Sequence, residues 1–125
     1  MHKCHISIFS AVDGKPTKTK LIGLLDLRSD PYVLSYRDGV SEVCLTFGET
    51  VVIERRGDYG LYLPLVKGEK TEGILRFGEK EELISVLTEN FRISTDQTGL
   101  KFKAEYGLDF GEFVQNMRLY LVAKI

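Results

Sequence analysis

Residues 100–110 read Leu-Lys-Phe-Lys-Ala-Glu-Tyr-Gly-Leu-Asp-Phe, and this stretch decides the fold class. Apolar residues occupy every second position, and charged residues or glycine stand between them. Side chains of a β-strand point alternately to its two faces, whereas a helix with this sequence would carry apolar residues around its whole circumference. The stretch therefore predicts a half-buried β-strand.

The final segment of the chain repeats this alternation. From residue 113 to residue 125 one face is mostly apolar, and the other face carries Arg118, Tyr120 and Lys124. The sequence Asp-Phe-Gly-Glu at 109–112 stands between the two runs and is typical of a hairpin turn. We predict two long antiparallel strands joined by a tight connection.

Shorter strands are predicted along the rest of the chain. Turn-forming pairs such as Asp13-Gly14, Asp38-Gly39 and Gly57-Asp58 separate the apolar runs at intervals of eight to twelve residues, which is typical of a sandwich or a barrel. Closing a row of hairpins into a barrel removes both unpaired edges, and no long connection indicates a crossing. We predict an all-β fold: one antiparallel up-and-down barrel of about eight to ten strands, formed by residues 1–125 as a single domain.

The segment 79–91 fits two structures equally well from its local pattern. Leu83, Leu87 and Phe91 are spaced by four residues, as on one face of a helix, and the acidic residues before them suit a helix N-terminus. The residues between 83 and 88 also alternate as they would in a strand.

Composition and charge narrow the class of protein. The chain has 125 residues, 43% hydrophobic and 28% charged, with a net charge of −1. A near-neutral chain with scattered Lys and Arg argues against a nucleic-acid partner bound through many phosphates, and no apolar stretch is long enough to span a membrane. The N-terminus does not have the pattern of a secretory signal, and Cys4 and Cys44 are predicted to be reduced thiols. We expect a cytoplasmic protein without nucleic-acid or membrane partners, with a second copy of the chain as a candidate partner in a homodimer.

Short motifs in a shared order run along nearly the whole chain. They are Leu34-Ser35-Tyr36, Arg55-Arg56-Gly57, Gly68, Val86-Leu87-Thr88, Glu105-Tyr106-Gly107-Leu108 and Gln115-Asn116-Met117. In this order they resemble the YwiB-like proteins, a bacterial family of unknown function with a calycin-type, lipocalin-like β-barrel. The chain departs from the family at 77–80, where many members carry a Thr-Pro-aromatic-Gly turn. The resemblance implies a barrel and a strand at 79–91, and it implies no catalytic residues because the family has no accepted activity.

Arg55 is the leading candidate for a binding residue. It follows Val51 and Ile53 at the spacing that puts all three side chains on one face of a strand. If that face is the inner one, the guanidinium enters the barrel and can hold a carboxylate or phosphate of a ligand with two hydrogen bonds. The alternatives are an ion pair with an internal carboxylate, or a strand end at which Arg55 reaches solvent.

Three tyrosines are the other candidates. Tyr36, Tyr62 and Tyr106 could place their hydroxyl groups inside the barrel and orient a ligand beside Arg55. The more common role of such tyrosines is to bury the ring and donate a hydrogen bond to a backbone carbonyl.

No residue pattern indicates catalysis, a metal site or a cofactor. His2, Cys4 and His5 lie together at the N-terminus, but no third ligand for the same face stands nearby. An enzyme therefore ranks last among the candidate functions, and we predict no catalytic residues, no metal and no cofactor.

Two functions from different classes remain. The first is a non-catalytic module that binds a small, partly apolar ligand in the barrel, with Arg55 as the polar contact. The second is a partner-binding or regulatory protein with a packed barrel. Its contact surface would be an exposed strand or the aromatic face of Tyr32, Leu34 and Tyr36.

Overall fold

The computed structural model describes residues 1–125, which form ten β-strands and no helix. The strands are β1 (His2–Val12), β2 (Lys15–Asp26), β3 (Tyr32–Asp38), β4 (Ser41–Phe47), β5 (Val51–Arg56), β6 (Gly60–Leu65), β7 (Lys70–Phe77), β8 (Lys80–Asp96), β9 (Gly99–Asp109) and β10 (Val114–Lys124). β2 and β7 begin at Lys15 and Lys70, in polar sequence that pairs but is mostly exposed.

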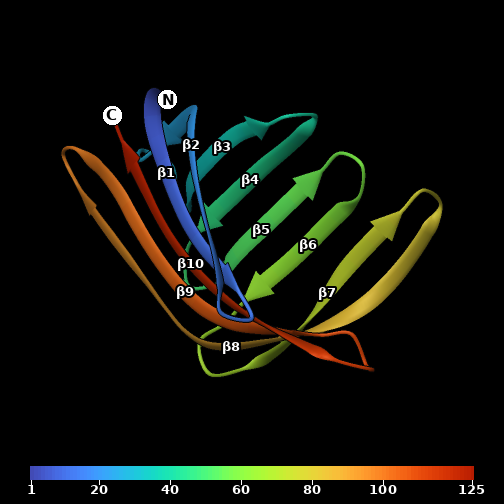
Figure 1. The fold of residues 1–125 in the computed structure, drawn as a ribbon. Coiled ribbons are helices and arrows are strands. Elements are labelled where there is room, and N and C mark those ends of the chain that lie inside the picture. The colour runs from blue at the N-terminus through green and yellow to red at the C-terminus, as the bar shows by residue number, and fades with distance from the viewer.

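The strands form one closed antiparallel barrel in up-and-down order (Figure 1). Each strand pairs with its neighbours in the chain, and β1 closes the ring by pairing with β10 from His5↔Lys124 to Val12↔Met117. The predicted all-β, up-and-down barrel is confirmed. Closure gives every strand two neighbours, but β2 pairs with β3 only from Gly23 to Asp26, and β6 pairs with β7 only from Gly60 to Tyr62.

The alternation at 100–110 has the predicted outcome. Leu100, Phe102, Ala104 and Tyr106 in β9 are buried, and the lysines between them are exposed. β9 and β10 pair over their full length, and Gly111 takes a positive φ of 95° in the connection between them. A positive φ is a conformation that glycine adopts without strain.

Residues 80–91 belong to β8, so this segment is a strand, as the family resemblance implied. A β-bulge between Thr88 and Asn90 adds one residue to β8 opposite β9. The bulge shifts the alternation, so that Leu87 lies on the outer face and Phe91 lies inside. The four-residue spacing therefore arises from a bulged strand.

Large apolar side chains fill the barrel toward the end where both termini lie. The ring of Phe102 packs against the rings of Phe47 and Phe91, with centroids 5.1 and 6.2 Å apart. Leu25, Leu34, Val51, Leu65 and Leu100 are completely or almost completely buried around them. We call this region the packed half of the interior.

The opposite end carries the connections β1–β2, β3–β4, β5–β6, β7–β8 and β9–β10, and we call it the Arg55 end. The last inner side chains of β5 and β3 lie at this end.

The structure contains no helix with the length and hydropathy required to cross a membrane.

Candidate functional site

Arg55 lies on the inner face of the barrel, close to the last residue of β5. It pairs across the sheet with Val43 of β4 and Leu61 of β6, and Val51 and Ile53 precede it on the same face. Leu45 and Leu63, the cross-strand neighbours of Ile53, are buried on this same face. The alternation at the end of β5 therefore turns a guanidinium toward the interior.

Tyr36 and Tyr106 reach the same region from β3 and β9. Tyr36 is two places from Arg55 in one row of cross-strand neighbours, with Val43 between them. Burial, together with the negative charge of Asp38, raises the pKa of Tyr36 to about 12, and the positive charge of Arg55 opposes this rise. Burial and the neighbouring Tyr36 raise the pKa of Tyr106 to about 12. Arg55, Tyr36 and Tyr106 are thus brought together, and both phenols are neutral at pH 7.

The guanidinium of Arg55 lacks a counter-charge. None of the three ion pairs in the molecule includes it, and its buried Nε has no hydrogen-bond partner. The guanidinium makes a cation–π contact with the ring of Tyr59, whose centroid is 4.4 Å from the guanidinium carbon. Of the alternatives for Arg55, the internal ion pair is not formed, and the side chain is partly exposed one residue before the end of β5.

The predicted inward orientation of Tyr62 is wrong. Tyr62 pairs with Glu54 and Ile74, and its side chain lies on the outer face with 36% of its surface exposed. Its neighbours Leu61 and Leu63 take the inner positions of β6, so alternation puts the tyrosine on the other side. Tyr62 therefore does not join the group around Arg55.

Two residues of this region were not predicted. Tyr59, in the connection between β5 and β6, covers Arg55, and Thr88 is the cross-strand neighbour of Tyr106. Two buried side-chain polar atoms have no hydrogen-bond partner, and they are Arg55 Nε and Thr88 Oγ1. Thr88 stands at an inner position of β8, as the alternation with Ile84 and Val86 could have shown.

Exposed apolar side chains border the Arg55 end. Val40, Phe77 and Phe113 are more than half exposed, and they come from three different connections or strand ends at this end of the barrel. Phe77 lies against Tyr59 at 5.9 Å between ring centroids, and Tyr59 in turn covers Arg55. The charged group is therefore next to apolar surface.

The aromatic face predicted for partner binding is not on the surface. Tyr32, Leu34 and Tyr36 pair with the inner residues Phe47, Leu45 and Val43, respectively, and Leu34 is completely buried. The alternation was correct, but the sequence does not say which face of a strand is the inner one. These side chains contribute to the core and leave no aromatic stripe for another chain.

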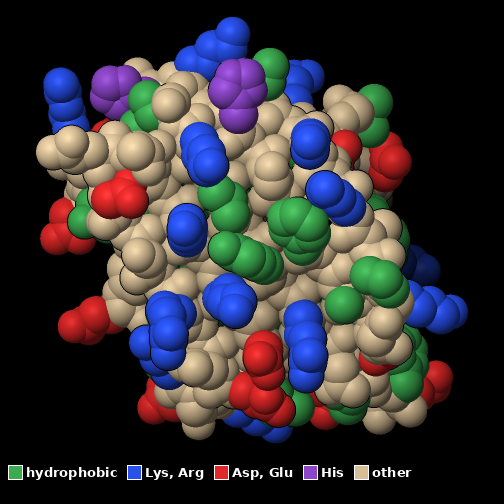
Figure 2. Space-filling model, turned by 60° about the vertical axis from the view of Figure 1, so that its left-hand side comes forward, with side chains coloured by type: hydrophobic (Ala, Val, Ile, Leu, Met, Phe, Trp, Pro, Cys, Tyr) green, Lys and Arg blue, Asp and Glu red, His purple; other side chains and the backbone are tan.

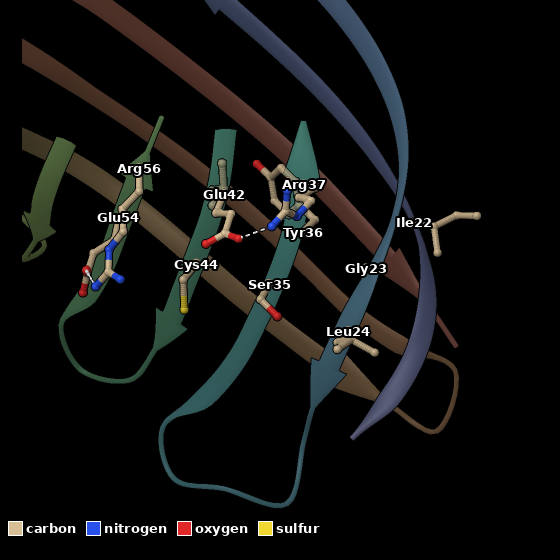
Figure 3. Close-up of a pocket in the computed structure, with 11 residues that line it drawn as sticks. Ile22, Gly23, Leu24, Ser35, Tyr36, Arg37, Glu42, Cys44, Glu54 and Arg56 are labelled. Carbon is tan, nitrogen blue, oxygen red and sulfur yellow. Dashed lines mark hydrogen bonds and ion pairs between the residues drawn. The ribbon is translucent and has the colours of Figure 1, made fainter. Parts of the chain in front are cut away.

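A hollow of about 650 Å³ lies on the outer surface over β2 to β5 (Figure 3). Arg37 and Glu42 form an ion pair on one side of it, and Glu54 and Arg56 form a second on the other. Cys44 lies between these pairs, and burial, followed by the negative charge of Glu54, raises the pKa of its thiol. A thiol with a raised pKa is a poor nucleophile at pH 7, so this hollow does not activate Cys44.

The N-terminal cluster is divided between the two faces of β1. Cys4 is buried in the core, where burial raises the pKa of its thiol, and His5 is exposed on the outer face. The two side chains therefore point to opposite sides of the sheet.

Comparison with known proteins identifies the fold. The crystal structure of the ywiB protein from Bacillus subtilis is similar to this chain with a TM-score of 0.79 at 14% sequence identity, covering 98% of this chain and 89% of the other. No protein-family model and no curated protein sequence matches. The resemblance to a YwiB-like barrel is confirmed at the level of the fold, and a likeness at this identity assigns no activity.

Proposed function

We propose that the protein is a non-catalytic binding module that takes the anionic group of a small, partly apolar molecule at the Arg55 end of the barrel. One observation carries the proposal: Arg55 turns an uncompensated guanidinium inward, with a buried Nε that has no partner. A buried donor without a partner costs about 1–3 kcal/mol, and a carboxylate or phosphate removes that cost through charge-assisted hydrogen bonds.

The surroundings of Arg55 support an organic anion. The rings of Tyr59 and Phe77 offer apolar contact beside the guanidinium, and the neutral phenols of Tyr36 and Tyr106 can donate hydrogen bonds to an anionic oxygen. No carboxylate lies within ion-pair distance of Arg55, so none there would repel such a ligand. Large apolar side chains fill the packed half of the interior, and this favours a site at the Arg55 end over one at the centre of the barrel. Both cysteines are free, which supports a cytoplasmic location.

The test compares Arg55→Met with Arg56→Met. These adjacent arginines face opposite sides of β5, so Arg56→Met removes the same charge without touching the interior. Octanoate and octyl phosphate serve as probes, with octanol as the uncharged control, and binding is followed by titration calorimetry and by backbone amide NMR shifts.

We expect at least one anionic probe to bind the unmodified protein and the Arg56→Met variant, with shifts at β3, β5 and β9. Arg55→Met should weaken binding about 10- to 100-fold, the loss expected for one charge-assisted contact. Equal binding to both variants, or equal binding of octanol, would contradict the proposal.

A partner protein is the second candidate, and the exposed Val40, Phe77 and Phe113 favour it. A partner would bury this apolar border and insert a carboxylate toward Arg55. Light scattering on purified protein, and affinity capture with a Phe77→Ser, Phe113→Ser double variant as control, test this function. A protein that is monomeric by light scattering and captures no other protein would contradict this second function.

A further inference from the structure

The outer surface of β2, β1, β10, β9 and the second half of β8 gathers cations that are far apart in the sequence. One row of cross-strand neighbours runs Lys18, Phe9, Tyr120, Lys103, Arg92. The next row runs Lys20, Ser7, Val122, Lys101, Ser94. Five neighbouring strands at about 4.8 Å spacing make each row about 19 Å long. Alternation and register thus place scattered lysines on one surface, which we call the basic face.

The basic face differs in charge from the whole molecule. It carries eight cations and five carboxylates; the cations are Lys3, Lys18, Lys20, Arg92, Lys101, Lys103, Arg118 and Lys124, and the acidic residues are Asp26, Glu89, Asp96, Glu105 and Asp109. Figure 2 shows Lys and Arg side chains spread around a group of hydrophobic side chains, with Asp and Glu mostly toward the margins. The prediction of no nucleic-acid partner used the net charge of the whole chain, and that single value does not show that the charge is unevenly distributed over the surface.

None of the cations of this face takes part in an ion pair within the protein. All three ion pairs lie elsewhere, on β3, β4, β5, β7 and the start of β8. Lys103 and Arg92 are direct cross-strand neighbours, an arrangement of like charges that destabilises a sheet. Unpaired and mutually repelling cations are complementary to a polyanion.

Two aromatic rings lie at the centre of the basic face. Phe9 is 41% exposed, and its ring centroid is 6.1 Å from that of Tyr120. The ammonium groups of Lys18 and Lys103 lie 5.2 and 5.4 Å from the centroids of Phe9 and Tyr120, respectively. Both rings line a shallow outer hollow of about 590 Å³. Flat rings next to cations are the combination that binds unpaired bases by stacking and the phosphates by charge.

We propose that the basic face binds single-stranded nucleic acid, with the phosphates on Lys18, Lys20, Lys101 and Lys103 and with bases stacked at Phe9 and Tyr120. A duplex fits less well, because the barrel wall presents no element that enters a groove, and paired bases cannot stack on side chains. An acidic peptide would use the cations but would leave the two rings without a matching planar group. This site is separate from Arg55, which faces the interior.

The test measures fluorescence anisotropy of labelled single-stranded dT15 and U15 with the full chain. We expect saturable binding that weakens about 50-fold between 50 and 200 mM salt, the dependence for about four phosphate contacts on a single strand. The two probes distinguish DNA from RNA, and binding of either one supports the proposal. Absence of binding at 50 mM salt overturns it.

Variants distinguish a specific binding site from general electrostatic attraction between lysines and nucleic acid. Lys18→Glu with Lys103→Glu should abolish binding, whereas the control Lys70→Glu with Lys80→Glu makes the same charge change at exposed lysines elsewhere and should retain it. Phe9→Leu with Tyr120→Leu keeps every cation and should weaken binding at least 10-fold, by removal of stacking. Thermal melting of each variant confirms that it is folded.

Three results would overturn the proposal. They are equal losses in the Lys70, Lys80 control, equal affinity for a 15-base-pair duplex, and equal competition by polyglutamate of the same charge. The last result would assign the face to an acidic peptide.

Discussion

The two halves of the barrel interior differ in what they bury. In the packed half, the ring of Phe102 packs against the rings of Phe47 and Phe91, among buried Leu and Val side chains. At the Arg55 end, the inner positions hold a guanidinium, two neutral phenols and the hydroxyl of Thr88. Both halves lie on the same strands and share the same ladder of hydrogen bonds.

Under the proposed function, this difference separates stability from ligand binding along the length of the barrel. Apolar burial in the packed half contributes about 25 cal/mol for each Å² removed from water. Buried polar atoms without partners oppose folding, so the Arg55 end lowers the net stability. The difference in stability between the two halves can be measured.

Phe102→Ala should produce the largest effect. Phe102 is completely buried and lies between two other rings, so its removal leaves a cavity at the centre of the packed half. We expect the free energy of unfolding to fall by about 3–5 kcal/mol, measured by urea denaturation. Phe77→Ala, which removes a ring that is 52% exposed, is the control and should cost much less. Similar losses would show that the packed half is not the main source of stability.

Alkaline pH should destabilise the Arg55 end. The pKa of Tyr36 and of Tyr106 is about 12 in the folded protein, against an ordinary value of 10, so the unfolded chain loses these protons more easily. The stabilisation is therefore complete below pH 10 and is lost as the pH rises from 10 to 12. For Tyr106 it is about 3 kcal/mol. Urea denaturation at several pH values checks this, and the Tyr36→Phe, Tyr106→Phe double variant should show a smaller decrease; an unchanged decrease would contradict the assignment.

Thr88→Val should have the smallest effect and the opposite sign. The change replaces a buried hydroxyl that has no partner by a methyl group of similar size, so we expect the free energy of unfolding to rise by about 1 kcal/mol. In Thr71→Val, the hydroxyl that is lost donates a hydrogen bond to the carbonyl of Pro64, and stability should fall by a similar amount. A loss of stability in Thr88→Val would mean that Oγ1 has a partner in solution.

The sequence predicted the fold wherever the two-residue alternation was unbroken. β9 shows this most clearly, because its inner and outer residues differ sharply in polarity. The alternation was broken in β8, where the bulge moved Phe91 to the inner face and produced a spacing like that of a helix. A single extra residue has no pattern of its own in a sequence, so the local pattern left the ambiguity open, and only the family resemblance indicated the strand that the pairing with β9 shows.

The site was predicted in part for the same reason. Arg55 follows Val51 and Ile53 with the correct parity, and its inward position was one of the predicted alternatives. Tyr62 stands between Leu61 and Leu63, so the same rule could have placed it outside. The basic face could not be predicted, because Lys18 and Lys103 are brought together only by the register of β1, β10 and β9.

The pairing of β1 with β10 has a consequence for how the chain reaches this structure. Every other pairing joins neighbours in the chain across a short connection, but His5↔Lys124 and its successors join the first strand to the last. Nine pairings can form as hairpins at low entropic cost, whereas the tenth closes a loop of more than a hundred residues and costs more. Ring closure is therefore the step that topology makes slow, and until it occurs β1 and β10 each have a free edge at which two unfinished barrels can join.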